Sequence, residues 1–355
     1  MTDINTGATA TPQEVQAAHG QLSAELFAVR FEEVARNVET VIKGKHDIVR
    51  LALVALFAEG HVLFEDVPGV GKSMMARAIG RSISAEVGRI QCTPDMLPGD
   101  ITGSSILDQA RMQFVFTPGP IFANILLADE VNRATPKTQS ALLEAMAERT
   151  VTADGHSHPL PRPFLVLATQ NPIELAGTFP LPEAQLDRFL FKLSIGYPDG
   201  DAETEVLRSN GRAPAINSLR PVINAADVVA MTEWAAGVTV SEPVLRYIVD
   251  LVAATRTDPA LQMGASPRAS LALLWASRVR AATEGREDVY PDDVKALLGA
   301  VLGHRVLLSP DASLRGESIE GVLERCLARV RPPLVSRRAG SAAASAGALA
   351  AVVAG

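Results

Sequence analysis

A short glycine-rich segment constrains the fold of this chain more than any other feature. It reads DVPGVGKS from Asp66 to Ser73, follows the apolar run His61–Glu65 and precedes the helical run Met74–Ile79. Such a turn lets backbone N–H groups and a helix N-terminus converge on phosphates, while the lysine and hydroxyl reach the terminal phosphates and Mg²⁺. The segment therefore predicts a nucleotide phosphate loop, with these cofactor-binding residues: Pro68, Gly69, Val70, Gly71, Lys72, Ser73 and Met74.

Asp66 stands where the common phosphate-loop pattern has its first glycine. Gly69 and Gly71 still let the backbone approach a phosphate closely. Because the Gly-Val-Gly-Lys-Ser end builds the anion-binding turn, the departure weakens the pattern match and leaves the physical reason intact. Taken alone, the segment has one alternative interpretation, a chance glycine turn before a helix.

A second apolar run, Ile125–Asp129, ends in a carboxylate and is followed by another, Glu130. In a nucleoside triphosphate site, Asp129 holds Mg²⁺ through its water shell and Glu130 polarises the attacking water. A strand that ends in Asp-Glu is often only a strand leaving the core. Its position after the phosphate loop favours the functional interpretation.

A third apolar run, Leu165–Thr169, leads into Gln170-Asn171-Pro172. At the end of a strand beside the other two, Asn171 is placed to orient the attacking water and to touch the terminal phosphate. Ordinary turn chemistry is the alternative, and without the two earlier segments it would be the preferred one.

Alternating apolar runs and helical stretches predict an α/β fold with a parallel sheet. Several runs are apolar almost throughout, which is typical of parallel strands covered on both faces. The expected strands are His61–Glu65, Gly88–Cys92, Ile125–Asp129, Leu165–Thr169 and Phe189–Ser194. Two hairpins are also expected, one from Ser104–Ile106 with Gln113–Phe116 and one within Thr150–Pro161.

Beyond residue 197 the pattern becomes helical and no strand-like run stands out. We therefore expect an N-terminal helical extension over 1–24, an α/β nucleotide-binding domain over 25–197, a helical lid domain over 198–335 and a disordered tail over 336–355. The expected lid helices are Asn224–Ala236, Ser241–Arg256, Ser266–Glu284, Pro291–Val306 and Ser318–Val330.

Composition excludes several classes of protein. With 47% hydrophobic and 21% charged residues in 355, most of the chain is expected to fold. The longest apolar run, Leu51–Ala58, is far shorter than the ~18 residues of a membrane helix, so we expect a soluble, cytoplasmic protein. The net charge of −7 argues against bulk attraction to nucleic acid or an anionic membrane.

Cysteine and histidine usage gives no sign of a disulfide framework or a metal centre. Cys92 and Cys326 lie far apart in unrelated contexts and are expected to be small buried hydrophobes. Among the six histidines only His156 and His158 are close together, and no third ligand stands at a recognisable spacing.

The motifs together resemble the AAA+ ATPases, and more narrowly the MoxR family, over about residues 25–335. The resemblance implies a sheet ordered 5-1-4-3-2 with an all-helical lid, assembled as a ring, usually of six, with ATP or ADP between subunits. The segments that carry it are Glu65–Ser73, Gln91–Gly103, Asp129–Ala134, Ala168–Pro172 and Leu181–Phe189.

The resemblance also implies roles for single residues. Lys72 and Ser73 match the phosphate-loop residues, Asp129 the Mg²⁺ partner, Glu130 the catalytic base and Asn171 the first sensor. The expected Mg²⁺ ligands are Ser73 and Asp129.

Two arginines match further elements of the family. Arg188 matches the arginine finger given to the neighbouring subunit's ATP, and planar guanidinium groups suit the charge of phosphoryl transfer. Arg268 matches the second sensor, and a cation near a helix N-terminus is electrostatically favourable only beside an anion. The role of Arg133 stays open: it either reaches across the subunit interface or is an exposed charge at a helix start. The adenine is expected near Ile42 and Gly44.

By the same resemblance, the two hairpins are the helix-2 insert and the pre-sensor-1 hairpin, elements that face substrate or partner in AAA+ rings. Members of the family are thought to act with von Willebrand factor A domain proteins in the maturation of enzymes or complexes. The leading hypothesis is therefore an ATP-driven remodelling machine. An ATP-gated binding scaffold is a second hypothesis, and a nucleic-acid motor, disfavoured by the acidic charge, is a third.

Overall fold

The computed structural model describes residues 22–66, 69, 71–110, 112–171, 177–197, 200, 204, 207 and 216–334. Four predictions concern residues outside this range. They are Pro68 and Val70 of the phosphate loop, most of the N-terminal extension, and the tail from residue 336.

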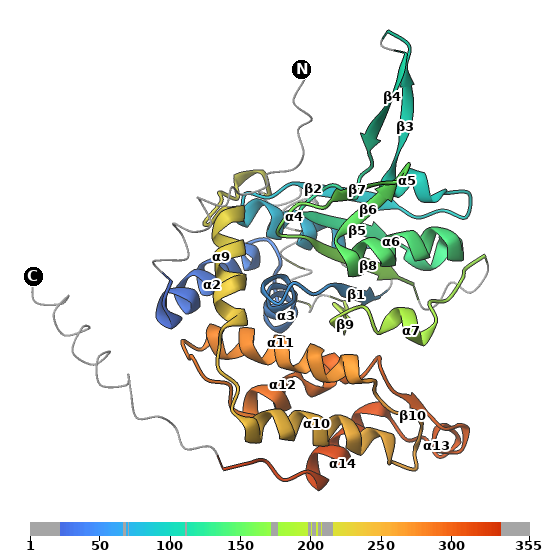
Figure 1. Cartoon of the computed structure of the whole chain (residues 1–355). Helices are drawn as coiled ribbons and strands as arrows, with labels where there is room; N and C mark the ends of the chain where they lie inside the picture. Colours follow the sequence, from blue (N-terminus) through green and yellow to red (C-terminus); the bar gives the residue numbers. More distant parts are fainter. Residues whose placement is uncertain are drawn as a thin grey trace, which may run out of the picture.

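A five-stranded parallel sheet forms the centre of the nucleotide-binding domain (Figure 1). Its order is β2-β5-β8-β1-β9, which is the predicted order 5-1-4-3-2 read from the other edge. The strands are β1 (Val62–Glu65), β2 (Val87–Gln91), β5 (Ile125–Asp129), β8 (Leu165–Gln170) and β9 (Phe191–Leu193). Each one overlaps a strand expected from the sequence.

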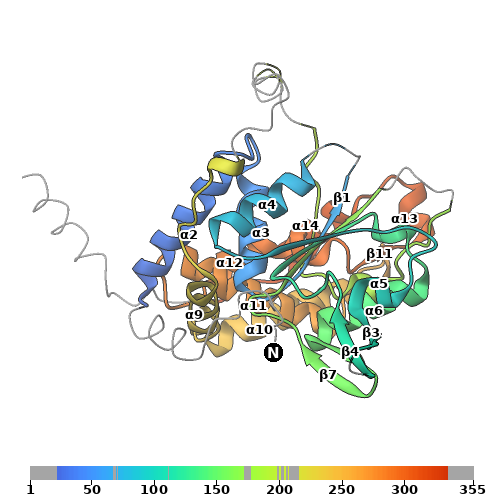
Figure 2. The same cartoon turned by 90° about the horizontal axis from the view of Figure 1, so that it is seen from above.

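Both faces of the sheet are buried, which explains the near-continuous apolarity of its strands. In β1, Val62 and Phe64 join one hydrophobic core, whereas Leu63 between them joins the other. The alternation follows the two-residue period of a strand. Helices cover both faces (Figure 2), and the chain thereby forms three layers.

One face is covered by α2 (Ala24–Glu39), α3 (His46–Phe57) and α4 (Lys72–Ser82). The other face is covered by α5 (Pro98–Thr102) and α6 (Pro136–Glu148). Short helical turns at η1 (Val131–Arg133), α7 (Glu183–Leu186) and η2 (Ile216–Ser218) complete the domain. Helix α6 starts where Thr135 accepts the N–H of Thr138 and proline occupies the first turn, a favourable start.

The two expected hairpins are present. One joins β3 (Gly103–Asp108) to β4 (Gln113–Pro118), and the other joins β6 (Thr150–Ala153) to β7 (His156–Pro159). The first projects from the body of the protein (Figure 1). At its base, a Cβ on Gly103 would lie within 2.2 Å of the Thr117 carbonyl oxygen, so only glycine fits there.

The lid consists of α9 (Ala225–Ala236), α10 (Glu242–Arg256), α11 (Pro267–Thr283), α12 (Pro291–Leu302), α13 (Pro310–Leu314) and α14 (Ile319–Arg329). The five expected helices all form. The expectation of a purely helical lid is wrong in one detail, because β10 (Leu261–Met263) pairs antiparallel with β11 (Leu307–Leu308). Strands of two or three residues carry no readable period, and their pairing is distant in sequence.

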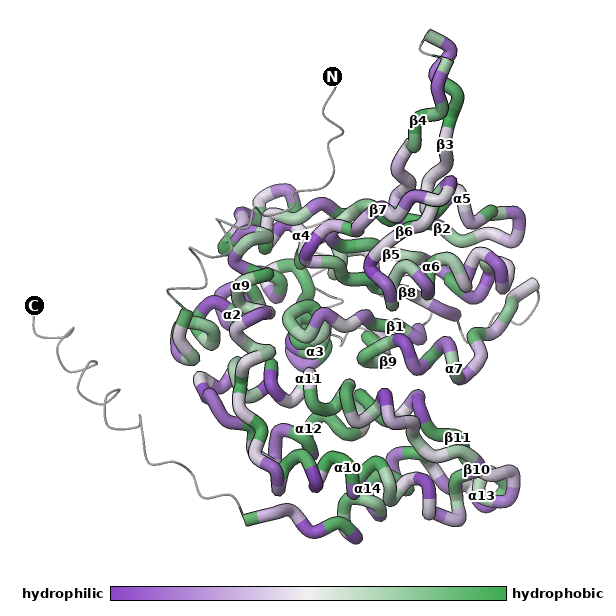
Figure 3. Tube along the Cα trace, viewed as in Figure 1, coloured by the Kyte–Doolittle hydropathy of each residue, from purple (hydrophilic) through white to green (hydrophobic). Residues whose placement is uncertain are grey.

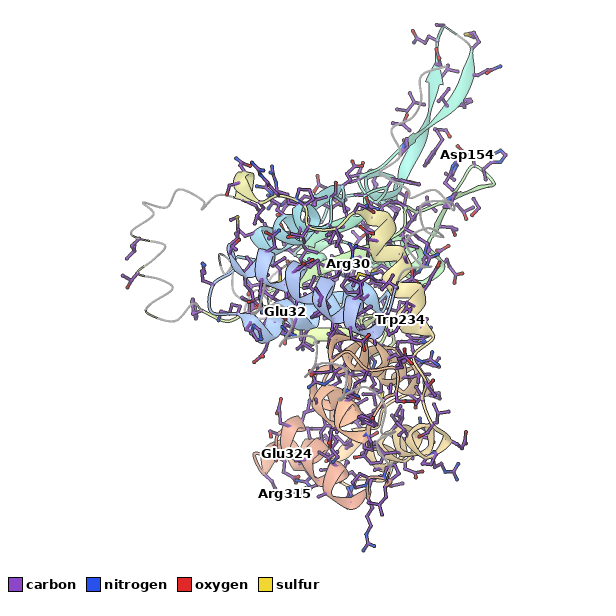
Figure 4. All side chains as sticks on the ribbon, turned by 90° about the vertical axis from the view of Figure 1, so that its left-hand side faces the viewer. Arg30, Glu32, Asp154, Trp234, Arg315 and Glu324 are labelled. Carbon is purple, nitrogen blue, oxygen red and sulfur yellow. The ribbon has the colours of Figure 1, made fainter. Side chains whose placement is uncertain are left out.

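The lid and the α/β domain share one continuous hydrophobic core. Helix α11 packs against α2 and α3 as well as against α9 and α12. On α9, Trp234 lies beside α2 (Figure 4), with its ring centre 5.6 Å from that of Phe27. Helix α9 therefore belongs to the lid by sequence position and rests against the α/β domain by packing.

Candidate functional site

A pocket of about 320 Å³ opens at the carboxyl ends of β1, β5 and β8, beside the start of α4. This is where ligands bind in open parallel sheets, because the strand ends and a helix N-terminus meet there. Described residues that line the pocket are Asp66, Gly69, Gly71, Lys72, Ser73, Met74, Arg89, Gln91, Asp129, Glu130, Thr169, Gln170 and Asn171. The structure thus brings the three predicted motifs together in one place.

The phosphate loop ends in a left-handed residue that starts α4. Gly71 has φ +97° and occupies the N-cap of the helix, and Gly69 has φ +88°. Both values lie in the region that favours glycine. The first helical residues, Lys72 and Ser73, therefore stand at the positive end of the helix dipole, where an anion is stabilised.

Lys72 points into a partly buried, acidic environment. Its Nζ donates to the backbone carbonyl of Asp66 at 3.0 Å. Burial lowers the pKa of Lys72, and the charges of Asp66, Asp129 and Glu130 oppose that shift. A lysine held in this way presents a point charge to a polyanion that enters the pocket.

Asp129 ends β5 with a carboxylate that is almost fully buried. Its Oδ2 accepts the Nε–H of Arg89 at 2.9 Å, and its Oδ1 accepts the hydroxyl of Thr169 at 3.4 Å. Arg89 comes from the neighbouring strand β2, whose register sets it opposite Leu127.

Glu130 follows in a left-handed backbone conformation with φ +55°. Non-glycine residues adopt this conformation rarely, and such strain concentrates at functional sites. Its N–H donates to Thr169 Oγ1 at 2.8 Å, which fixes the turn. Its carboxylate accepts hydrogen bonds from Gln91 at 3.1 Å and from Arg133 at 3.2 Å. The carboxylate is thereby held at the pocket with part of its surface exposed.

Asn171 lines the same pocket just after β8. Its backbone carbonyl accepts the Asn132 amide at 3.5 Å. Next to it, Gln170 donates to Glu65 at 2.6 Å and so connects the ends of β8 and β1. The predicted first sensor therefore stands at a strand terminus on the pocket wall.

The oxygen donors fit Mg²⁺. The Ser73 hydroxyl and the Asp129 carboxylate both line the pocket, and Mg²⁺ takes one or two protein oxygens together with substrate phosphates and water. In the part of the chain that the structure describes, no three acidic, histidine or cysteine side chains gather as a metal cage. Two oxygen donors suit an ion that takes its other ligands from phosphate and water.

Two predicted site residues, Arg188 and Arg268, lie away from the pocket. They are near the amino ends of the sheet strands, whereas the pocket is at the carboxyl ends. Arg188 precedes Leu190, whose N–H donates to His61 O at the amino end of β1. The Arg188 guanidinium donates to Leu143 O at 2.6 Å. Arg268 is exposed in the first turn of α11, which is capped by Ser266.

Asp187 connects the regions of those two arginines. It accepts Ser266 Oγ at 2.9 Å and Arg305 Nε at 2.8 Å. Arg305 is fully buried and also donates to the carbonyls of Leu190 and Phe189. Burial lowers the pKa of Arg305, the Asp187 carboxylate opposes that shift, and the nearby charge of Arg268 adds to it.

The predicted adenine residues do not line the pocket. Ile42 is buried in the core and Gly44 forms a left-handed turn with φ +69°. The next residue, Lys45, donates to Tyr197 O at 2.8 Å, just after the stretch that Asp66 binds. The turn therefore lies near the phosphate loop through this connection.

Sequence reasoning missed Arg89, Gln91, Thr169 and Gln170 as pocket residues. One signal was present for the first two, because Arg89 and Gln91 alternate on a strand that the sheet order places beside Asp129. For Thr169 and Gln170, the available signal was their position as the two residues before the predicted sensor Asn171.

Other predictions can be placed as well. Cys92 and Cys326 are both buried and free, as expected, and burial raises the pKa of Cys92 to about 12. His158 stacks on Phe116 of the other hairpin at 4.0 Å between ring centres. Among the described helices, none is long and apolar enough to span a membrane.

Comparison with known proteins identifies both parts of the chain. Residues 61–191 match the model of the ATPase family associated with various cellular activities, AAA, and residues 253–326 match that of the AAA lid domain. A crystal structure of a proposed ATPase from Cytophaga hutchinsonii superposes with a TM-score of 0.82 at 36% identity. It covers 91% of this chain and all of that one.

Relatives are similar over most of their length. Chaperone MoxR1 of Mycobacterium tuberculosis is 43% identical over 89% of this chain and 85% of its own. Protein YeaC of Bacillus subtilis is 48% identical over 85% and 94%, and protein MoxR of Paracoccus denitrificans is 32% identical over 82% and 92%. On these similarities and on the fold, the chain belongs to the MoxR family of AAA+ ATPases.

Proposed function

We propose that this protein hydrolyses ATP with Mg²⁺ at the subunit interfaces of a six-membered ring, and uses the energy to remodel a protein partner in the cytoplasm. One observation carries the proposal: Lys72, Asp129 and Glu130 line a single pocket at the carboxyl edge of the sheet. Phosphoryl transfer needs these three roles, namely a cation on the phosphates, a metal-holding carboxylate and a group on the attacking water.

The residues divide the work by position. Backbone N–H groups at the start of α4 and the Lys72 ammonium bind the phosphates. The Glu130 carboxylate orients and accepts a proton from the attacking water, and Asn171 positions that water against the terminal phosphate. Ser73 and Asp129 would hold Mg²⁺, which would supply positive charge to offset the negative charge that develops on the phosphates.

Arg188 and Arg268 would complete the site of a neighbouring subunit. Both come from the region at the amino ends of the strands, away from their own pocket, and a network through Asp187 joins that region. A guanidinium from the neighbour would make hydrolysis depend on assembly, because the charge spread over the transferring phosphoryl group needs it.

The projecting hairpin β3–β4 supports an action on a protein partner. Its tube carries green, hydrophobic stretches in Figure 3, and several of its large apolar side chains are exposed. The exposed side chains are Ile106, Leu107, Met112, Phe114 and Val115. Exposed apolar surface of this kind marks interaction sites. A von Willebrand factor A domain protein is the partner that the family suggests, whereas nucleic acid is disfavoured by the net charge of −7.

A scaffold gated by ATP is the second candidate, favoured only by the exposed hairpin. The Lys72→Ala variant tests nucleotide binding itself, since loss of the ammonium should abolish binding of ATP. The Glu130→Gln variant then separates the two functions, because it should bind ATP without hydrolysing it. If this variant supports full cellular function, the protein is an ATP-gated scaffold. If it binds ATP but does not function in the cell, the protein is a remodelling ATPase.

A further inference from the structure

Asp66, the residue that departs from the common phosphate-loop pattern, accepts three hydrogen bonds with its carboxylate. The residue is 6% exposed. Oδ1 accepts the hydroxyl of Ser194 at 2.7 Å and the N–H of Gly196 at 3.0 Å, and Oδ2 accepts the N–H of Ile195 at 2.6 Å. All three donors come from one stretch, 194–196, directly after β9.

The backbone of Asp66 faces the nucleotide pocket. Its carbonyl accepts Lys72 Nζ at 3.0 Å, and its N–H donates to Gln170 O at 3.3 Å, one step beyond the β1–β8 ladder. Asp66 therefore stands between the phosphate-binding lysine on one side and the segment after β9 on the other. Its side chain holds the segment and its main chain holds the lysine.

The segment that Asp66 binds leads from the sheet toward the lid. Gly196 has φ +65°, and the Tyr197 carbonyl accepts Lys45 Nζ at 2.8 Å. Residues 194–197 are thus fixed on one side by the phosphate loop and on the other by the turn that precedes α3. A change in the phosphate loop has a direct path to this connection.

Electrostatics explain why three donors are needed. A carboxylate beside a phosphate site repels the ligand, and a buried carboxylate is costly unless it is hydrogen-bonded. Charge-assisted hydrogen bonds are about twice as strong as neutral ones, so the three donors offset both effects. A glycine in this position would leave the N–H groups of Ile195 and Gly196 without this acceptor.

We propose that Asp66 is a positioning residue for nucleotide binding, which fixes the phosphate loop and its lysine on the segment 194–196 and so couples nucleotide binding to the connection that leads to the lid. The inference rests on the proposed ATPase function. If Asp66 has this role, then aspartate at position 66 is required for nucleotide binding by this chain, and glycine cannot replace it.

The test compares Asp66→Gly, which restores the common pattern, with Asp66→Asn, which turns an amide N–H toward the N–H of Ile195. Asp250→Asn, an exposed carboxylate on α10, is the matched control. Affinity for fluorescent N-methylanthraniloyl-ATP is measured together with the melting temperature without nucleotide. Both Asp66 variants should bind about tenfold more weakly or worse, a change of ~1.4 kcal/mol, with a raised KM and a smaller change in kcat. Asp250→Asn should bind as the wild type does.

A second readout separates positioning from plain stability. In the wild type, nucleotide should slow hydrogen exchange at the amides of Ile195 and Gly196, and in Asp66→Gly this protection should be lost. Should Asp66→Gly fail to fold, Ser194→Ala removes one donor of three and should weaken binding about threefold.

Wild-type affinity in Asp66→Gly, or in Ser194→Ala where that variant replaces it, would overturn the inference. Absence of nucleotide binding by the wild type would overturn the proposed function instead, so the two failures are distinguishable.

Discussion

Arg89 Nε donates to Oδ2 of Asp129 at 2.9 Å, so the carboxylate predicted to hold Mg²⁺ is also the partner of an arginine from the neighbouring strand. The Arg89 side chain is 53% exposed, whereas that of Asp129 is 11% exposed. An ion pair of this kind is worth under ~1 kcal/mol. It is strong enough to orient the carboxylate and weak enough for a divalent ion to displace.

The first prediction concerns that competition. Replacing Arg89 by alanine removes the cation that shares Asp129, so half-maximal ATPase activity should need less Mg²⁺, by up to about fivefold. Arg89→Lys keeps the charge and should stay close to the wild type. Mg²⁺ titration at saturating ATP measures the effect, and an unchanged Mg²⁺ requirement in Arg89→Ala would show that the pair does not compete.

The second prediction tests action between subunits. Arg188→Ala should lose about 10³-fold in turnover, as removal of an arginine finger typically does, while keeping ATP binding. Mixed with Lys72→Ala, it should regain part of the activity, because some interfaces then combine an intact arginine with an intact pocket. Two inactive variants that stay inactive when mixed, despite co-assembly, would contradict a role in trans.

The third prediction concerns the buried ion pair behind Arg188. Arg305 binds the Asp187 carboxylate and four backbone carbonyl groups with its side chain 2% exposed, so Arg305→Ala leaves a buried carboxylate and carbonyls without these donors. Denaturant titration should show a loss of ~3–5 kcal/mol in the free energy of unfolding. Arg246→Ala, which breaks an exposed pair with Asp250, should cost under ~0.5 kcal/mol. Similar losses of unfolding free energy in the two variants would show that the buried contacts of Arg305 do not stabilise the fold.

The fourth prediction is a loss of stability in acid. Burial lowers the pKa of His61 from 6.5 to about 4 and that of His304 from 6.5 to about 3. His61 is held neutral, since Nδ1 accepts the N–H of Val166 at 3.1 Å. Below pH 6.5 the unfolded chain therefore binds more protons than the folded chain, and the stability present above that pH is lost as the pH falls toward 4.

Each histidine contributes a slope of up to ~1.4 kcal/mol per pH unit in this window. Denaturant titrations at several pH values between 7 and 4 measure this slope. The range runs from above the ordinary histidine pKa of 6.5 down to the lowered pKa of His61. His61→Gln keeps a donor and an acceptor without titrating, so its slope should be shallower. A slope identical to that of the wild type would mean that His61 is protonated in the folded protein.

Local patterns predicted residues that the fold gathers at one pocket, because these residues lie in short segments at strand ends. The ends of β1, β5 and β8 meet at one edge as soon as the sheet is parallel, so Lys72, Asp129 and Asn171 come together by topology. The hairpins and the lid helices were equally visible, since turn residues and helix starts are local signals.

Contacts between distant parts of the chain were not predictable in this way. The carboxylate of Asp66 accepts hydrogen bonds from residues about 130 positions later in the chain, and Ser266 donates to Asp187 about 80 positions earlier. Neither pair has a periodic or spacing signal. The same holds for β10 and β11, which form only because the lid brings Leu261 and Leu308 together.

The most direct test of the account is single-turnover hydrolysis of Mg²⁺-ATP by the wild type and by Glu130→Gln, with ATP binding measured on the same samples. The Glu130 carboxylate stands at the pocket beside Asp129, and the amide keeps its shape without its basicity. Glu130→Gln should bind ATP with wild-type affinity and lose at least ~10²-fold in turnover. Turnover at the wild-type rate in that variant would contradict the proposed role of Glu130.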